Sequence, residues 1–331
     1  MKILVTGGAG YIGSTVASAA LDSGHDVVIL DDFSEGKKEF VKDRIFYEGD
    51  IADQHLLDTI FSEHNIDAVV HCAASIVVPE SWEKPLEYYE NNVGKTLDLL
   101  KGMLRNNVNS IVFSSSASVY ADPTDGFAVT EDSPLDTNCP YAETKRMMER
   151  ILIDTAQGTP LRPIILRYFN PIGADPLMRT GQQREKISHV VWKMVDALEN
   201  DTQFTITGCD WNTPDGTGIR DYIHIWDLAC AHVSALEKLP TLVNDDNTSE
   251  IINIGTGRPM SVRQLTDAFM EATQSTLRVA EGPARPGDVI GAYAVTEKAQ
   301  RLLGWSSKLS VAQGIKDAVQ WSRVRKDILG Y

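Results

Sequence analysis

Residues 7–13 read GGAGYIG, and this stretch constrains the fold more than any other part of the chain. The apolar run KILVT comes directly before it, and the small-residue segment YIGSTVASAALDSG overlaps its end. Such a run is typical of a buried parallel strand, and such a segment, closed by a glycine, is typical of a helix. Three glycines in this setting permit a tight turn and a close backbone approach to a pyrophosphate, which faces the helix N-terminus. They are Gly7, Gly10 and Gly13.

The same alternation of apolar run and helical segment continues as far as Asn170. Strands that alternate with helices form a parallel sheet covered on both faces, so we expect an α/β, doubly wound fold. After Asn170 the chain becomes polar and rich in glycine and proline, which predicts a second, smaller domain. The expected strands are 2–6, 25–32, 44–50, 67–74, 110–120 and 162–170, and the expected helices are 11–24, 51–64, 85–107 and 139–156.

Asp31 stands at the end of the second expected strand. A carboxylate at this place would hold the ribose hydroxyls of NAD. Asp31 and its neighbour Asp32 would also repel a 2′-phosphate, which favours NAD over NADP. A glycine turn alone is a weak signal, because turns that bind nothing are also rich in glycine. Strand, helix and acid together favour a dinucleotide site.

Tyr141 and Lys145, in the segment YAETK, share one face of the helix expected at 139–156. Taken alone, this pair is more typical of an ordinary helix surface. A tyrosine base active near neutral pH needs its pKa lowered from about 10, which takes about 4 kcal/mol of differential stabilisation. A lysine ammonium and an oxidised nicotinamide would both favour the phenolate. Ser116 follows the fifth expected strand, at the sheet edge where ligands of such folds bind.

The chain has 331 residues, a formal net charge of −15 and four cysteines. An acidic chain repels phosphate backbones and anionic lipid, so we expect neither nucleic acid nor membrane as a partner. The scattered cysteines and the seven histidines show no metal-ligand spacing, so no metal is expected. No run approaches the ~20 apolar residues of a membrane span, and the N-terminus lacks the features of a signal peptide. These features indicate a reducing, cytoplasmic setting.

The glycine loop, the serine at a strand end and the YxxxK pair together resemble the extended short-chain dehydrogenase/reductase family. Within it, the sequence is most similar to the UDP-galactose 4-epimerases. The resemblance implies a Rossmann-type NAD-binding domain over 1–169, joined by part of 222–254, and a UDP-sugar-binding domain over 170–331. The stretches that carry it are VTGGAGYIGS, KPLEYYENNV, FSSSASVY, PYAETK, LRYFNPIGA and DGTGIRDYIHIWDLA, which run through most of the chain.

The resemblance also implies residue roles. Tyr141 would be the base for the sugar 4-hydroxyl, Lys145 would lower its pKa and hold the nicotinamide ribose, and Ser116 would hydrogen-bond the same hydroxyl. The implied reaction is NAD-dependent transient oxidation at C4, after which hydride returns to either face of the 4-keto sugar. The implied NAD contacts are Gly7, Gly10, Tyr11, Ile12, Gly13, Asp31, Asp50, Ile51, Asn91, Tyr141 and Lys145. The implied substrate contacts are Ser116, Asn170, Arg220, Tyr222, Arg285 and Asp288.

At five positions this chain departs from the family pattern or leaves a role open. Ile76 stands where some members have a lysine that contacts the cofactor, which would weaken cofactor binding. His189 stands where an asparagine usually contacts uracil, and it either replaces that contact or packs elsewhere. Ala292 stands at the sugar-pocket gate, where a small residue makes room for an N-acetyl group. Cys139 either packs or, when alkylated, blocks the site, and Arg285 is also compatible with a plain surface charge.

Three other classes of protein fit the sequence less well. Related dehydratases and decarboxylases need an acid beside the family serine, where this chain has Ala117 and Ser118. A non-catalytic NAD-binding sensor protein would have lost the Tyr/Lys pair, and a serine hydrolase would need GxSxG. A second set of alternatives keeps the reaction but changes the sugar to a UDP-N-acetylhexosamine or a UDP-uronate.

The helices expected at 85–107 and 139–156 carry apolar stripes. In relatives the two helices pair across a dimer as a four-helix bundle, so we expect a homodimer. The alternative is that both stripes only cover the sheet, since one stripe cannot serve both surfaces. The stripes consist of Leu97, Leu100 and Leu104 on the first helix and Met147, Met148 and Ile151 on the second.

Overall fold

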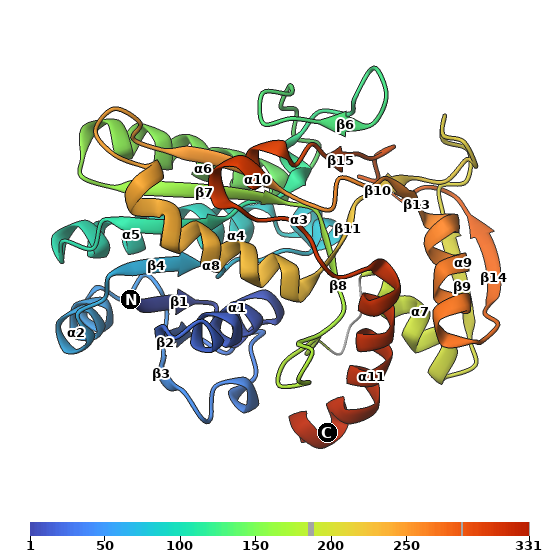
Figure 1. The fold of residues 1–331 in the computed structure, drawn as a ribbon, viewed down its shortest axis with the longest axis horizontal. Coiled ribbons are helices and arrows are strands. Elements are labelled where there is room, and N and C mark those ends of the chain that lie inside the picture. The colour runs from blue at the N-terminus through green and yellow to red at the C-terminus, as the bar shows by residue number, and fades with distance from the viewer. Residues whose placement is uncertain (185–188, 286, 331) are drawn as a thin grey trace.

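A seven-stranded parallel sheet forms the centre of the protein in the computed structural model, which describes residues 1–184, 189–285 and 287–330 (Figure 1). Its strand order is β12-β7-β5-β4-β1-β2-β3. The order reverses between β1 and β4, and ligands of such sheets bind beside this switch point, at the carboxyl ends of the strands. The strands are β1 (Lys2–Thr6), β2 (Asp26–Asp31), β3 (Ile45–Glu48), β4 (Ala68–His71), β5 (Ser110–Ser114), β7 (Arg162–Tyr168) and β12 (Glu250–Ile254).

Helices cover both faces of this sheet, as the alternating sequence pattern predicts. In β1, Ile3 and Val5 belong to the core of one face, whereas Leu4 belongs to the core of the other. This alternation follows from the two-residue period of a strand. The first face packs against α1 (Tyr11–Asp22) and α8 (Ile225–Leu242), and the second against α2 (Gln54–His64), α5 (Lys95–Arg105) and α6 (Pro140–Gly158). The structure therefore confirms the doubly wound fold.

Two predicted elements are interrupted. The helix expected at 85–107 is divided into α4 (Pro85–Tyr89), a π-helical turn over Glu90–Gly94 and α5. The strand expected at 110–120 ends at Ser114, and a 3-10 turn over Ala117–Val119 follows it. Hydrophobic period alone cannot show such interruptions, because they replace hydrogen bonds without changing the apolar pattern.

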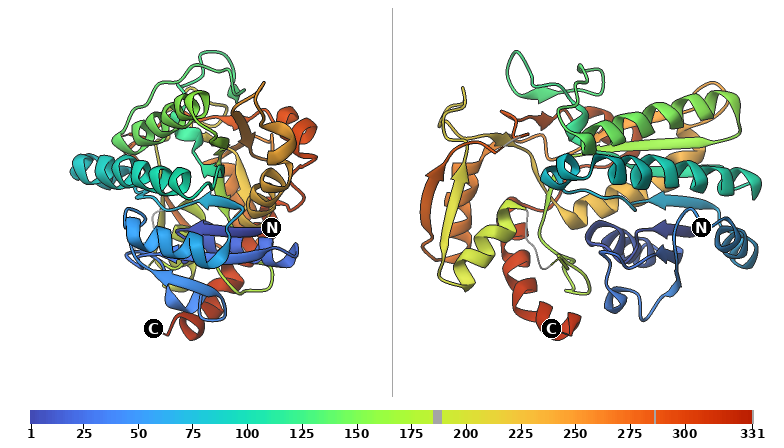
Figure 2. Two further views of the ribbon diagram at one scale, coloured as in Figure 1. Left: turned by 90° about the vertical axis from the view of Figure 1, so that its left-hand side faces the viewer. Right: turned by 180° about the vertical axis from the view of Figure 1, so that it is seen from behind.

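The chain from Asn170 onward builds a second group of elements and also returns to the sheet. Here α8 lies beside α1, and β12 is the seventh strand, parallel to β7. Most of the remaining elements gather beyond one end of the sheet, as Figures 1 and 2 show. They are α7 (Val190–Glu199), α9 (Val262–Thr273), α11 (Val311–Leu329) and the paired strands β8 (Asn170–Ile172) with β11 (Tyr222–His224), β9 (Gln203–Thr207) with β14 (Arg278–Gly282), and β10 (Ile219–Arg220) with β13 (Met260–Ser261). In addition, α10 (Glu297–Leu303) packs against α8 and β12, and β15 (Tyr293–Ala294) pairs with β6 (Ala128–Val129) from the first part of the chain.

The described residues offer neither a helix that could span a membrane nor a cluster of metal ligands. None of the described helices is both long and apolar enough to cross a membrane. No group of three or more histidine, cysteine or acidic side chains in the described part of the chain is arranged to hold a metal ion.

Candidate active site

The glycine loop between β1 and α1 is shaped for close approach of another group. Gly7 has φ +69°, and a Cβ there would lie 2.6 Å from the backbone nitrogen of Ala73. A Cβ on Gly13 would lie 2.2 Å from the Gly7 carbonyl oxygen. Both positions therefore exclude any side chain. Gly10 caps α1, with its amide donating to the Gly7 carbonyl at 3.1 Å. The loop thus presents bare backbone and a helix N-terminus to the carboxyl edge of the sheet.

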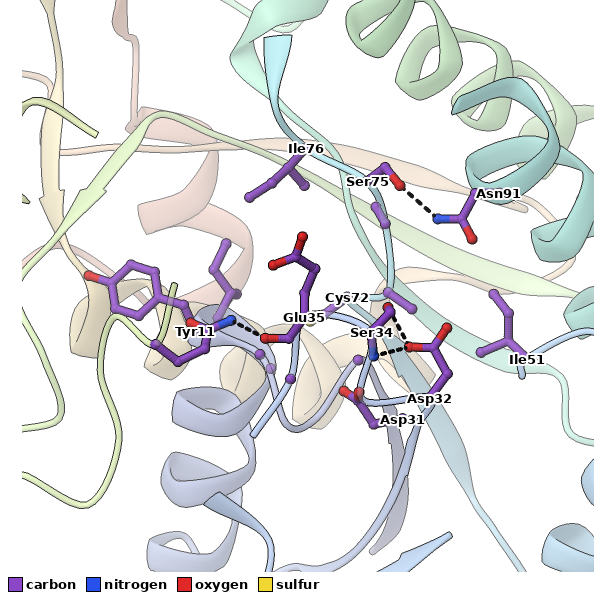
Figure 3. Close-up of a pocket in the computed structure, with 18 of the residues that line it drawn as sticks. Tyr11, Asp31, Asp32, Ser34, Glu35, Ile51, Cys72, Ser75, Ile76 and Asn91 are labelled. Atoms are coloured by element: carbon purple, nitrogen blue, oxygen red, sulfur yellow. Dashed lines mark hydrogen bonds between the residues drawn. The ribbon is translucent and has the colours of Figure 1, made fainter. Parts of the chain in front are cut away.

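Asp31 closes β2 beside this loop. One carboxylate oxygen accepts a hydrogen bond from the Ala9 amide at 2.9 Å, and the other accepts from Phe33 at 2.8 Å. Burial raises the pKa of this carboxyl, and the charge of Asp32 raises it further. Asp32 itself accepts from the Ser34 amide at 2.9 Å and from its hydroxyl at 2.6 Å (Figure 3). The carboxylates expected at the second strand end are therefore held by backbone and hydroxyl donors.

The π-helical turn brings two consecutive asparagines to the end of β4. Asn91 donates to the Ser75 hydroxyl at 3.1 Å (Figure 3), and the Asn92 amide bridges the Ser75 backbone with bonds of 2.8 and 2.9 Å. Asn92 also donates to Thr144 of α6 at 3.1 Å. The extra residue of a π turn offers a physical reason why neighbours in sequence face the same loop. The turn thereby links the pocket wall at Asn91 to the helix that carries Lys145.

One pocket joins these features at the switch point of the sheet. Figure 3 shows Tyr11 and Ile51 on opposite sides of it, with Asp31, Asp32, Ser34 and Glu35 between them. All predicted NAD contacts line it except Tyr141, and so does His189. Ile76 also lines it and is 38 % exposed. Sequence reasoning missed further charged and polar members of the wall, because their positions carry no motif: Ser34, Glu35, Glu80, Lys95, Gln182, Gln183 and Arg184.

The residues present fit an NAD cofactor. The glycine cradle that a Cβ would fill accommodates a pyrophosphate, and buried Asp31 presents carboxylate oxygens at the place of a ribose diol. His189 is predicted either to replace the uracil contact or to pack elsewhere, and this stays a prediction. It caps α7 and lines the dinucleotide pocket, where burial and the charge of Arg184 lower its pKa.

Tyr141 and Lys145 lie in the first turns of α6 and are 7 % and 4 % exposed. The Lys145 ammonium donates to the Ser114 carbonyl at 2.8 Å and lies 4.9 Å from the centre of the Phe113 ring. Ser116 accepts from the Ser118 amide at 3.2 Å and shares a 2.9 Å bond with its hydroxyl. Lys145 therefore fastens α6 to the strand that leads into Ser116.

The protein's own groups around Tyr141 raise its pKa, whereas the predicted lowering depends on Lys145 and an oxidised nicotinamide together. Burial raises the pKa of Tyr141 to about 12, and a side-chain hydrogen bond with Ser116 opposes this rise only in part. Burial also lowers the pKa of Lys145 to about 8, while the nearby Cys72 and Glu149 oppose that change. The protein groups alone therefore keep the phenol protonated at neutral pH. Burial in a low dielectric disfavours the charged form of each group, so it raises the pKa of Tyr141 and lowers the pKa of Lys145.

A buried ion pair supports α6 from below. Arg167 of β7 donates to the Glu149 carboxylate through Nε at 3.0 Å and through Nη2 at 2.7 Å. Ser115 donates to the same carboxylate, and Arg167 reaches the Tyr120 hydroxyl at 3.1 Å. Tyr120 in turn donates to Asn253 of β12 at 2.7 Å. This network connects α6 with the ends of β5, β7 and β12.

Apart from Ser116, the predicted substrate residues lie on the chain after β7. Asn170 and Tyr222 are paired across β8 and β11. Arg220 is already engaged, because its guanidinium donates to three backbone carbonyls, those of Ile219 at 2.8 Å, Ile290 at 3.3 Å and Val289 at 3.0 Å. The structure thus makes Arg220 an anchor for the returning chain.

Arg285 and Asp288 contact each other. Arg285 Nη2 lies 2.9 Å from Asp288 Oδ1, and the Arg285 amide donates to Asp288 Oδ2 at 2.9 Å. The charge of Arg285 contributes to a lowered pKa of Lys193 on α7, after desolvation, so a second cation lies nearby. Sequence reasoning missed Lys193, since a lone lysine on a polar helix face carries no signal. Ala292 packs against a cluster that also contains Ala117, next to Ser116.

The fold and this site define an enzyme of the dinucleotide-binding, doubly wound class with a Tyr/Lys pair at the carboxyl edge of its sheet. The family model described as the NAD dependent epimerase/dehydratase family matches residues 3–255. The chain therefore belongs to the NAD dependent epimerase/dehydratase family.

Individual relatives match over nearly the whole chain. A UDP-glucose 4-epimerase of Halalkalibacterium halodurans is 41 % identical, over 98 % of this chain and 96 % of its own length. The structure of a UDP-glucose 4-epimerase from Stenotrophomonas maltophila with bound NAD and formylated UDP-arabinopyranose superposes with a TM-score of 0.93 at 35 % identity, covering 99 % of both chains. That of the Bifidobacterium longum enzyme in complex with NAD+ and UDP has a TM-score of 0.90 at 35 % identity, covering 100 % of both.

Proposed function

We propose that this protein is a UDP-sugar 4-epimerase that interconverts UDP-glucose and UDP-galactose with NAD as a resident cofactor. The observation that carries the proposal is the convergence of the glycine cradle, Asp31 and the Tyr141–Lys145–Ser116 group at one edge of the sheet. The relatives named UDP-glucose 4-epimerase support it along the full chain. A non-catalytic NAD sensor has no use for a buried tyrosine and lysine at this place.

In the proposed reaction, Tyr141 accepts the proton of the sugar 4-hydroxyl, and Ser116 hydrogen-bonds that hydroxyl and orients it. NAD, held by the glycine loop and Asp31, would supply the hydride acceptor for C4 and the hydride donor for the other face of the 4-keto sugar. Lys145 keeps its charge at neutral pH, because its pKa lies near 8. Its positive charge stabilises the Tyr141 phenolate relative to the neutral phenol. The positive charge of oxidised nicotinamide would lower the pKa of Tyr141 further, which the protein groups alone do not achieve.

The nucleotide half of the substrate would be held by Asn170, Tyr222, Arg220, Arg285 and Asp288. Arg285 is 48 % exposed along its side chain, so its guanidinium is free to exchange one carboxylate partner for a phosphate. Asp288 would then be released to accept a ribose hydroxyl. These contacts bind UDP and not the sugar ring, which has to rotate between the two hydride transfers.

Ala292 is the residue on which the sugar preference would depend. It packs against a hydrophobic cluster that contains Tyr120 and Phe169, and Ala117, the neighbour of Ser116, packs against the same cluster. A methyl side chain at this place leaves room for an N-acetyl group, so we propose that UDP-N-acetylglucosamine and UDP-N-acetylgalactosamine are also turned over. An enzyme that acts mainly on these sugars, or on a UDP-uronate, is the second candidate.

We also propose a division of the chain into two domains. Residues 1–169, together with part of 222–254, would form the NAD-binding domain, and the rest of 170–331 the UDP-sugar domain; α8 and β12, which pack on and extend the sheet, support this division. We further propose a cytoplasmic homodimer. Of the two expected stripes, Leu100 and Met148 are buried in the core under the sheet, and Leu97, Leu104 and Ile151 pack against that core. Met147 is 36 % exposed and Leu86, on α4, is 81 % exposed, and these two side chains support an apolar surface for the dimer.

A coupled assay tests the function. Purified protein is incubated with UDP-galactose, with no NAD added to the epimerase step, and denatured after a set time. UDP-glucose is then detected with its specific dehydrogenase in a separate reaction. Product establishes both the reaction and a retained cofactor, and Tyr141→Phe should abolish it. No product, even with NAD supplied to the first step, would overturn the UDP-galactose assignment and direct the assay to the N-acetyl sugars and the glucuronate.

A further inference from the structure

Two ion pairs join separate segments that line the dinucleotide pocket. Lys95 Nζ, at the start of α5, lies 2.6 Å from Asp50 Oδ2 in the loop after β3. Arg184 Nε, in the segment after β8, lies 3.2 Å from Glu35 Oε2 in the loop after β2. All four residues line the pocket. Each pair therefore ties together two pocket-lining segments that are far apart in sequence.

The pair at Glu35 has a second attachment. The Gln183 side-chain amide donates to the Glu35 backbone carbonyl at 3.1 Å. A Cβ on Gly10 would lie 3.9 Å from the same Gln183 nitrogen. The segment at 182–184 thus lies over the glycine loop itself, beside the place of the pyrophosphate.

Asn91 lies within the π-helical turn, and Lys95 follows directly after that turn. Both residues line the pocket. Asp50 is fixed independently, because its other carboxylate oxygen accepts from the Ala52 amide at 2.9 Å. An anchored acid and a helix-borne cation form a defined bridge, in contrast to two flexible surface chains. The two bridges lie near different parts of the pocket, one by Ile51 and one by Gly10.

We propose that the Lys95–Asp50 and Glu35–Arg184 pairs form a clasp that retains NAD, and that both must open for the cofactor to leave. Lys95, Glu35 and Arg184 then become cofactor-retaining residues that no motif indicates. This inference concerns the cofactor and does not depend on which sugar is turned over.

A simple charge effect makes a different prediction from the clasp. The pocket wall carries five carboxylates, those of Asp31, Asp32, Glu35, Asp50 and Glu80. If these only repelled the anionic pyrophosphate, removing the charge of Glu35 would slow NAD release. If Glu35 instead holds Arg184 across the pocket, removing its charge opens the clasp and speeds release.

The test uses holoprotein loaded with radiolabelled NAD and chased with excess unlabelled NAD. Lys95→Met, Arg184→Met and Glu35→Gln should each speed release about two- to fivefold, the range for an ion pair of this exposure. Lys38→Met is the matched control, because Lys38 pairs with Glu48 at 2.6 Å in the same part of the chain but outside the pocket. Its release rate should equal that of the unaltered protein.

Unchanged or slower release from Glu35→Gln would overturn the clasp. Two measurements keep the test independent of any one variant. Release from the unaltered protein should speed up with ionic strength, since exposed pairs are screened by salt, and the double variant of Lys95 and Glu35 should lose most of that dependence. Titration of stripped protein with NAD should show the same ratios in Kd, and equal Kd values for Glu35→Gln and Lys38→Met would contradict the proposal.

Discussion

The Lys145 ammonium donates a hydrogen bond to the Ser114 carbonyl at 2.8 Å, so the charged end of α6 is fastened to the end of β5. Ser116 follows two residues later. This contact between a helix and a strand therefore helps to position Tyr141, Lys145 and Ser116 relative to one another. The contact also buries a cation, and this has consequences that can be measured.

Lys145→Met should abolish activity and change how stability depends on pH. The folded pKa of Lys145 is about 8, below its ordinary value of 10.5, so between these values the unfolded chain holds a proton that the folded chain has released. The stability of the unaltered protein should therefore rise relative to the variant as pH increases, by about 2 kcal/mol between pH 7 and 9.5. Urea unfolding of both proteins measures this difference, and a constant difference would contradict it.

Tyr141 should titrate differently with and without cofactor. In stripped protein its phenol should ionise only well above pH 10, since burial raises its pKa to about 12. Loading with NAD should shift this ionisation toward neutral pH. Near-ultraviolet difference absorbance across a pH series shows phenolate formation, with Tyr141→Phe as the blank that removes the other tyrosines. Identical titrations of stripped and loaded protein would mean that the cofactor does not activate Tyr141.

Glu149→Gln should cost about 3–5 kcal/mol of stability, because it leaves the buried Arg167 guanidinium without its counter-charge. Replacing both partners together, as Glu149→Met with Arg167→Met, should cost less than the single change. Chemical unfolding of Glu149→Met, Arg167→Met and the double variant forms the cycle. Additive losses would show that the pair is not coupled, despite its 2.7 Å contact.

Arg220 and Arg285 should respond differently to the same substitution. Arg285→Met should raise KM for the UDP-sugar about tenfold or more and leave stability within about 0.5 kcal/mol, because the side chain is exposed. Arg220→Met should raise KM and also destabilise by about 1–3 kcal/mol, since three backbone carbonyls lose their donor. Steady-state kinetics and thermal unfolding separate the two. A stable Arg220→Met would contradict its role as an anchor.

Ser116→Ala should lower kcat about 100-fold with a small effect on KM, because the hydroxyl orients the reacting group rather than the nucleotide. Ser118→Ala is the control, as it removes only the 2.9 Å partner of Ser116. Its kcat should fall far less. Equal losses would indicate that the serines act only through the local turn.

The sequence by itself determined six of the seven strands of the sheet, the order of helices and strands before Asn170, and the position of the dinucleotide loop; it did not indicate β12 as the seventh strand. Local chemistry suffices for these, because a buried parallel strand, a glycine turn and a helix N-terminus each need residues of a certain kind in one short stretch. Gly7, Gly13 and Asp31 could be identified in this way, and the structure shows why no side chain fits at either glycine. The resemblance then located Tyr141 and Lys145 on one helix face.

Only the tertiary structure decided which charges meet. The bridges from Lys95 to Asp50 and from Arg184 to Glu35 join residues from separate elements, and neither member carries a motif. The break of the helix at 85–107 by a π turn, and the direction of the Tyr141 pKa, likewise depend on what lies around the residue. A pKa is a property of solvent exclusion and of neighbouring charges, and both arise only when distant segments pack together.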